Sequence, residues 1–78
     1  MRKKEIMNLI AEAEVGKDLR LIPTDKSEEL RLRNNIKRAQ LFGYKLVFTK
    51  LYDNVFYFEK LKEGNKEELL RDSLKNNR

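Results

Sequence analysis

Six basic side chains and no acidic one lie between Leu30 and Tyr52, a stretch called the basic segment below: Arg31, Arg33, Lys37, Arg38, Lys45 and Lys50. The whole chain has 18 Lys and Arg residues, 13 Asp and Glu residues, and a net charge of +5 at pH 7. All 13 acidic residues therefore lie outside the basic segment. A purely positive segment favours a polyanionic partner, because attraction and counterion release both strengthen such binding.

Four polar residues of the basic segment recur at helical spacing: Arg31, Asn34, Asn35 and Arg38. Positions i, i+3, i+4 and i+7 share one face of an α-helix. Arginine binds guanine edges or phosphates, asparagine pairs with adenine, and a helix laid in the major groove presents such residues together. We expect these four residues to face nucleic acid, with DNA favoured over RNA. The alternative is a solvated helix flank that binds no ligand.

The other cations of this region are expected to hold phosphates, which position a nucleic acid without reading its sequence. They are Arg33 and Lys37 on a helix and Lys45 and Lys50 on a following strand. The next strand adds Lys60, which could also contact a phosphate. Lysines on a strand also protect a sheet edge from aggregation, which is the alternative explanation for the last three.

Aromatic side chains follow the basic helix. Tyr52 lies at the tip of a predicted hairpin, where an exposed ring can stack on a base or bond to a sugar. A set of phenylalanines, Phe48, Phe56 and Phe58, has the composition of a stacking platform. We expect these three in the core instead, because so short a chain needs every large apolar group.

Several kinds of chemistry are excluded by composition. The chain has no cysteine and no histidine, so disulfides, Cys/His zinc sites, thiol catalysis and imidazole acid–base chemistry are absent. Two carboxylate pairs, Glu28-Glu29 and Glu67-Glu68, lie in the first turn of predicted helices, where acids stabilise the helix dipole. Neighbouring positions diverge by about 100° on a helix, so the paired carboxylates do not converge. We expect no catalysis, no metal and no cofactor.

The elements that position these residues follow from apolar periodicity. A first helix is predicted over residues 3–14, with Ile6, Leu9, Ile10 and Ala13 on one face. Leu19 to Ile22 is either a short strand or a loop, and Pro23 closes it. Asp25 caps a second helix over about 26–42, with Glu28 as its capping-box partner. The core face of this helix is expected to hold Leu32, Ile36, Ala39 and Gly43, and Leu30 and Leu41 fall nearly opposite.

A β-hairpin and a third helix complete the chain. A two-residue loop at Asp53-Asn54 would mix apolar and polar faces, whereas a three-residue loop at 52–54 places Leu46 and Phe48 beside Phe56 and Phe58. We therefore predict the three-residue loop, with Asn54 in a left-handed conformation. The third helix is predicted over 66–75, capped by Asn65 with Glu68, and its apolar stripe is Leu69, Leu70 and Leu74. Residues 76–78 are expected to fray.

Length and element order define the expected fold. The 78 residues are expected to form a single small α+β domain, with three helices around a central antiparallel hairpin in the order α-(β)-α-β-β-α. Over about residues 3–61 this order resembles a winged-helix DNA-binding domain. A helix-turn-helix needs two helices between Pro23 and Gly43, where this sequence has room for one. The resemblance therefore covers element order, implies DNA binding, and assigns no residue.

The expected role is a small regulatory or accessory protein that binds nucleic acid. A lean apolar content makes a homodimer a reasonable expectation. No apolar run is long enough to cross a bilayer and no secretory signal is recognisable, so we expect a cytoplasmic protein without a membrane partner. The alternative is a phage- or plasmid-type protein that inhibits or adapts a larger host protein by docking on its acidic surface.

Overall fold

The computed structural model describes residues 2–75, and the expectation for residues 76–78 lies outside that range. It confirms the α+β class and the predicted order of elements. The winged-helix resemblance is not confirmed, since a single helix lies between the first two strands. The elements are α1 (Lys3–Glu12), β1 (Asp18–Leu21), α2 (Lys26–Gln40), β2 (Lys45–Tyr52), β3 (Val55–Lys62) and α3 (Lys66–Lys75).

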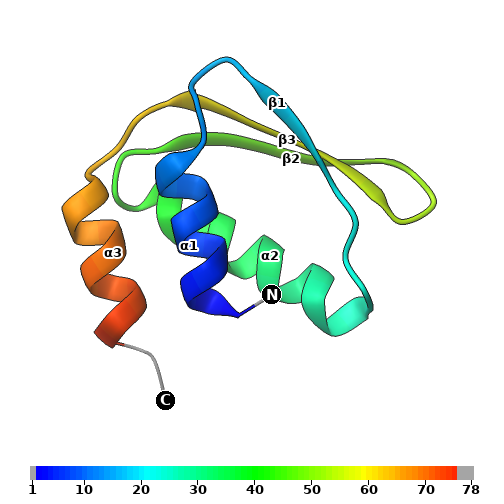
Figure 1. The fold of residues 1–78 in the computed structure, drawn as a ribbon, viewed down its shortest axis with the longest axis horizontal. Helices are drawn as coiled ribbons and strands as arrows, with labels where there is room; N and C mark the ends of the chain where they lie inside the picture. Colours follow the sequence, from blue (N-terminus) through cyan, green and yellow to red (C-terminus); the bar gives the residue numbers. More distant parts are fainter. Residues whose placement is uncertain (1, 76–78) are drawn as a thin grey trace.

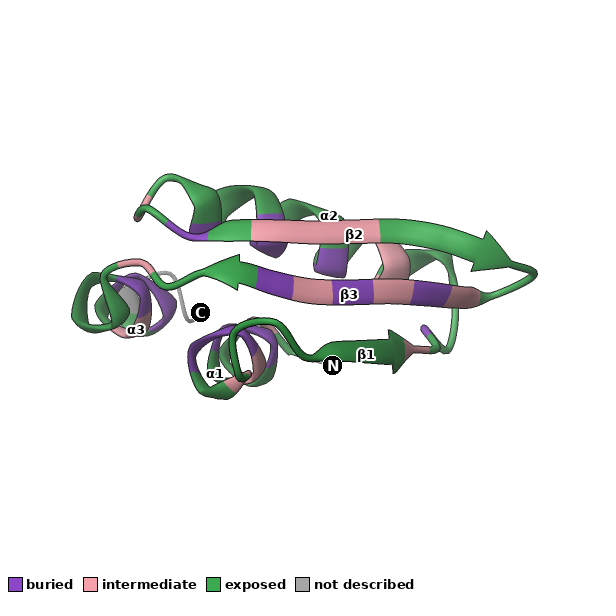
Figure 2. Cartoon of the chain, turned by 90° about the horizontal axis from the view of Figure 1, so that it is seen from above, coloured by how far each residue is buried: buried purple, intermediate pink, exposed green. Residues whose placement is uncertain are grey.

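The three strands form an antiparallel sheet in the order β1-β3-β2, so β2 is an edge strand. The short strand that the sequence left open is therefore present as β1. All three helices lie on one face of the sheet (Figure 1), and no described element covers the other face (Figure 2). Residues 55–60 of β3 alternate between partly buried and buried (Figure 2), as expected for a central strand with one covered face.

The hairpin register agrees with the sequence over most of its length. Leu46 pairs with Lys60 and Phe48 with Phe58, as the three-residue loop required. The loop itself has two residues, because Tyr52 pairs with Val55 and an irregularity between Lys50 and Tyr52 absorbs the extra residue. The left-handed residue is Asp53, with φ 41°, so the prediction for Asn54 was wrong. The Asn54 amide instead donates a hydrogen bond to the carbonyl oxygen of Pro23, which ties the hairpin tip to the chain after β1.

The core lies between the sheet and the helices. It includes Phe56 and Phe58 on β3 and Leu32, Ile36 and Ala39 on α2, and all five are buried as predicted. Two predictions about apolar faces were wrong. Gly43 is exposed, because α2 ends at Gln40 and Gly43 adopts a positive φ of 94° in the following turn.

The second error concerns α3, where Leu74 is exposed and Leu69 is buried. The buried face of α3 also holds Asp72 and Ser73. Its N-terminus is capped as expected, because Asn65 Oδ1 accepts a hydrogen bond from the Glu68 amide at 3.0 Å. The Asp25 carboxylate caps α2 in the same way, by accepting from the Glu28 amide at 2.9 Å.

Candidate nucleic-acid interface

The predicted stripe on α2 is not a continuous exposed face. Asn35 is only 8% exposed, and its amide Nδ2 donates to the carbonyl oxygen of Arg31 at 2.8 Å. The expectation that Asn35 faces a ligand was wrong, because Asn35 is three residues after Leu32 and lies on the core side with Ile36 and Ala39. Arg31 and Asn34 are exposed.

Arg38 is engaged within the protein. Its Nη2 and Nε donate to the two carboxylate oxygens of Asp72 on α3, at 2.8 and 3.2 Å, and Lys3 Nζ lies 3.4 Å from the same carboxylate. The Asp72 side chain is only 9% exposed. The hydrogen bond from Arg38, followed by the contact with Lys3, holds the pKa of Asp72 below its ordinary value, against the effect of burial. The Arg38 guanidinium is therefore not free to form hydrogen bonds with base edges, although the side chain remains half-exposed.

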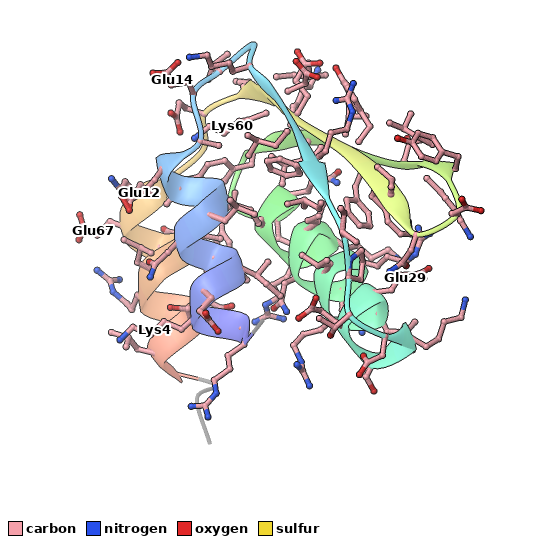
Figure 3. All side chains as sticks on the ribbon, turned by 45° about the vertical axis from the view of Figure 1, so that its right-hand side comes forward. Lys4, Glu12, Glu14, Glu29, Lys60 and Glu67 are labelled. Carbon is pink, nitrogen blue, oxygen red and sulfur yellow. The ribbon has the colours of Figure 1, made fainter. Side chains whose placement is uncertain are left out.

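Lys60 does not belong to the surface, so it cannot make the phosphate contact that its sequence position allowed. Its side chain is fully buried, and its ammonium donates to the carbonyl oxygens of Ile10 at 2.8 Å and Ala11 at 3.2 Å. It also donates to the Glu63 carboxylate at 3.0 Å. Figure 3 shows Lys60 at the end of α1 that carries Glu12. A cation satisfies the last carbonyl groups of a helix and complements its dipole, which explains this buried position.

An open groove of about 380 Å³ lies between α2 and β2 and is named the α2–β2 groove. Its lining combines two cations, two side-chain amides and an apolar floor, and it contains no acidic residue. The lining residues are Leu30, Arg33, Asn34, Ile36, Lys37, Gln40, Leu46 and Phe48. The groove brings together three predicted site residues, Arg33, Asn34 and Lys37.

Arg33 is held in a defined orientation at this groove. Its Nε donates to Glu29 Oε2 at 3.2 Å, one helical turn earlier. Its guanidinium carbon lies 5.6 Å from the ring centre of Phe48 and 5.4 Å from that of Phe56. These rings stack on each other with centres 4.8 Å apart and planes 4° apart. A carboxylate and an aromatic pair together fix the guanidinium, and the Arg33 side chain is still 44% exposed.

On β2, two lysines flank the groove residues Leu46 and Phe48 along the strand. Lys45 and Lys50 are exposed on β2, and the exposed Lys62 pairs with Lys45 across the sheet. Like charges at directly opposite positions are unfavourable unless solvent or an anion screens them. Within residues 2–75, neither Lys37 nor any of these three lysines forms an ion pair. In Figure 3 the acidic residues Glu12, Glu14 and Glu67 lie around α1 and α3, and Glu29 lies on α2.

The sequence could have revealed more of this site. Arg33, Lys37 and Gln40 follow the spacing i, i+4 and i+7, which places them on one helix face. Lys62 and Gln40 lie outside the predicted site, and Phe48, which was predicted in the core, is only half-buried and lines the groove. Tyr52 is exposed at the hairpin tip and is not among the groove residues.

No known protein family, curated protein or solved structure matches this chain. No helix within residues 2–75 is long and apolar enough to cross a membrane. The same residues contain no cluster of three or more Asp and Glu side chains arranged to hold a metal ion. The chemistry that the α2–β2 groove offers is the binding of an anion that also carries hydrogen-bonding groups and a flat apolar surface.

Proposed function

We propose that this protein binds nucleic acid through the α2–β2 groove and the lysines beside it, as a cytoplasmic accessory protein without catalytic activity. The observation that carries the proposal is a groove lined by Arg33 and Lys37, with Lys45 and Lys50 unpaired within the described residues on the adjacent strand. Phosphates satisfy such cations, and the amides of Asn34 and Gln40 can bond base edges or sugars.

Salt dependence tests this proposal. Binding of fluorescent oligonucleotides should weaken as salt rises, with a log–log slope of about −0.7 to −0.9 for each phosphate neutralised. Replacement of Lys45 and Lys50 by Gln should make the slope less steep by roughly 1.4–1.8 if each lysine holds one phosphate. The matched control is Lys4→Gln, which removes an exposed lysine from α1 (Figure 3) and should leave the affinity within roughly twofold. Absence of binding to any oligonucleotide at low salt contradicts the proposal.

A second function is favoured by one observation on α2. Leu30 and Leu41, which flank its polar outer side, are 55% and 73% exposed. Exposed leucines beside cations are anchors of the kind that a protein partner with an acidic surface would cover. Pull-down from cell extract with and without nuclease separates the two functions. A partner retained after nuclease treatment favours the protein-docking alternative, and partners lost on treatment favour nucleic-acid binding.

A further inference from the structure

We infer that the ligand of the α2–β2 groove is a single strand of nucleic acid, with one base stacked on the guanidinium of Arg33. This inference rests on the proposed function and specifies its ligand. Its basis is that the structure separates two sets of residues on α2. The stripe that was predicted to read a duplex is interrupted at Asn35 and Arg38. The residues suited to an unpaired base line a single groove.

A helix that reads a duplex must project a continuous polar face into the major groove. On α2 that face is interrupted, because Asn35 is buried and the Arg38 guanidinium is bonded to Asp72. The exposed flank also ends in two leucines, Leu30 and Leu41. Insertion of α2 into a major groove would therefore present an interrupted polar face to the base edges.

The polar groups that remain point to a concave site. Arg33, Asn34, Lys37 and Gln40 line the α2–β2 groove, which is walled by a helix on one side and an edge strand on the other. The bases of a duplex are stacked inside the helix and do not enter such a groove. An unpaired base can be turned out of its strand, and single strands are recognised by stacking on flat side chains and by bonds to exposed base edges.

Arg33 has the properties of a stacking surface. Glu29 and the stacked rings of Phe48 and Phe56 hold its planar guanidinium before any ligand arrives, so little side-chain freedom is lost on binding. Lys37 on the helix wall, with Lys45 and Lys50 along β2, would hold the phosphates on either side of the stacked base. Asn34 and Gln40 supply the hydrogen bonds to its edge.

The first test compares ligands. Fluorescence anisotropy is measured with an unstructured single strand of about 12 nucleotides, as DNA and as RNA, and with the matching duplex. We expect the single strand to bind at least roughly fivefold more tightly than the duplex, because only the single strand gains base stacking. Equal or tighter duplex binding overturns this inference and leaves the proposed function intact. Absence of binding to every oligonucleotide overturns both.

The second test compares two arginines. Arg33→Lys keeps the charge and removes the planar surface, so single-strand affinity should fall at least roughly fivefold with an unchanged salt slope. Arg20→Lys is the matched control, because Arg20 also bonds a carboxylate, Asp18, at 2.5 Å, and lies 5.3 Å from the ring centre of Tyr57. Arg20 and Tyr57 occupy the uncovered face of the sheet. Equal losses in the two variants contradict a special role for Arg33.

Lys37→Gln covers the case in which Arg33→Lys unfolds. Lys37 is exposed, so its removal should leave the melting temperature unchanged. Its loss should weaken single-strand binding and make the salt slope less steep by about 0.7. An unchanged slope and affinity place the bound strand outside the α2–β2 groove and overturn the inference.

Discussion

Two basic side chains of this protein are each held by several neighbouring groups, some of which are distant in sequence. Lys60 is buried because the last carbonyl groups of α1 and the Glu63 carboxylate satisfy its ammonium. Arg33 is oriented because Glu29 precedes it by one turn and two phenylalanine rings lie beneath it. In both cases a basic side chain has a structural partner, but only Arg33 remains open to a ligand.

Gly64 carries the sharpest steric requirement in the chain. A Cβ atom at this position would lie 2.5 Å from the carbonyl oxygen of Phe42, 2.6 Å from the amide nitrogen of Tyr44, and against the Tyr44 ring. Gly64→Ala should therefore lower the free energy of unfolding by roughly 1–3 kcal/mol, towards the upper end because two of the three contacts are backbone atoms. Urea denaturation measures the change.

The control for this prediction is Gly16→Ala. Gly16 has a positive φ of 86° but nothing within 4 Å of an added Cβ atom. Its replacement should cost only the local backbone strain, about 1 kcal/mol. If Gly64→Ala costs no more than Gly16→Ala, the turn before α3 does not pack against Phe42 and Tyr44 as described.

At the scale of elements, α3 is attached to the rest of the protein partly through a carboxylate. Asp72 accepts bonds from Arg38 of α2 and lies within ion-pair distance of Lys3 of α1. Leu69 is the fully buried residue that packs α3 into the core cluster. The ion cluster and this leucine together join the three helices. The same cluster explains why Arg38 is unsuited to binding a ligand.

The Asp72 contacts predict a pH-dependent stability. The pKa of Asp72 is lowered from its ordinary value of 3.8, chiefly by the hydrogen bond from Arg38. The stabilisation from a lowered carboxyl pKa is fully present above the ordinary value and is lost as pH falls through the lowered one. The difference in melting temperature between the natural protein and Asp72→Asn should thus be largest near neutral pH and shrink below about pH 4.

Thermal melts at a series of pH values test this prediction. The matched control is Asp53→Asn at the hairpin tip, where the side chain is exposed and forms no ion pair with the described residues. Its effect on melting temperature should be small at every pH. A difference between the natural protein and Asp72→Asn that stays constant down to pH 3 contradicts a stabilising ion cluster.

At the scale of the whole molecule, stability depends on one thin core between three helices and a sheet covered on a single face. Phe58 lies at its centre, on the middle strand, paired with Leu19 on one side and Phe48 on the other. Phe58→Ala should cost roughly 3–5 kcal/mol. A chain of this length has a total stability on the order of 4–12 kcal/mol, so the variant is expected to be marginal.

Urea denaturation of Phe58→Ala should show a lower midpoint with a similar slope. Tyr57→Ala provides the comparison, since Tyr57 immediately precedes Phe58 on β3 and points to the uncovered face of the sheet. We expect the Tyr57 variant to lose much less stability than the Phe58 variant. Equal losses would mean that both faces of the sheet are packed to a similar degree.

Local patterns in the sequence determined the elements. Caps at Asp25 and Asn65 and apolar spacing predicted α2 and α3 to within a few residues, because these signals act over one or two helical turns. Pleat alternation predicted the hairpin register over residues 46–50. The basic segment, which has no acidic residue, could also be recognised from the sequence, because only the positions of charges along the chain define it.

Only the tertiary structure decided which basic side chains of the helix and the hairpin remain free to bind a ligand. Arg38 meets Asp72 and Lys60 meets the end of α1, although each pair is more than 30 residues apart in sequence. Asn35 is buried because the buried face of α2 is wider than the apolar stripe of Leu32, Ile36 and Ala39 that the spacing predicts. Helical periodicity predicts which residues share a face of a helix. Packing between elements that are distant in sequence determines which face remains exposed, and the packing of α2 against β2 forms the α2–β2 groove.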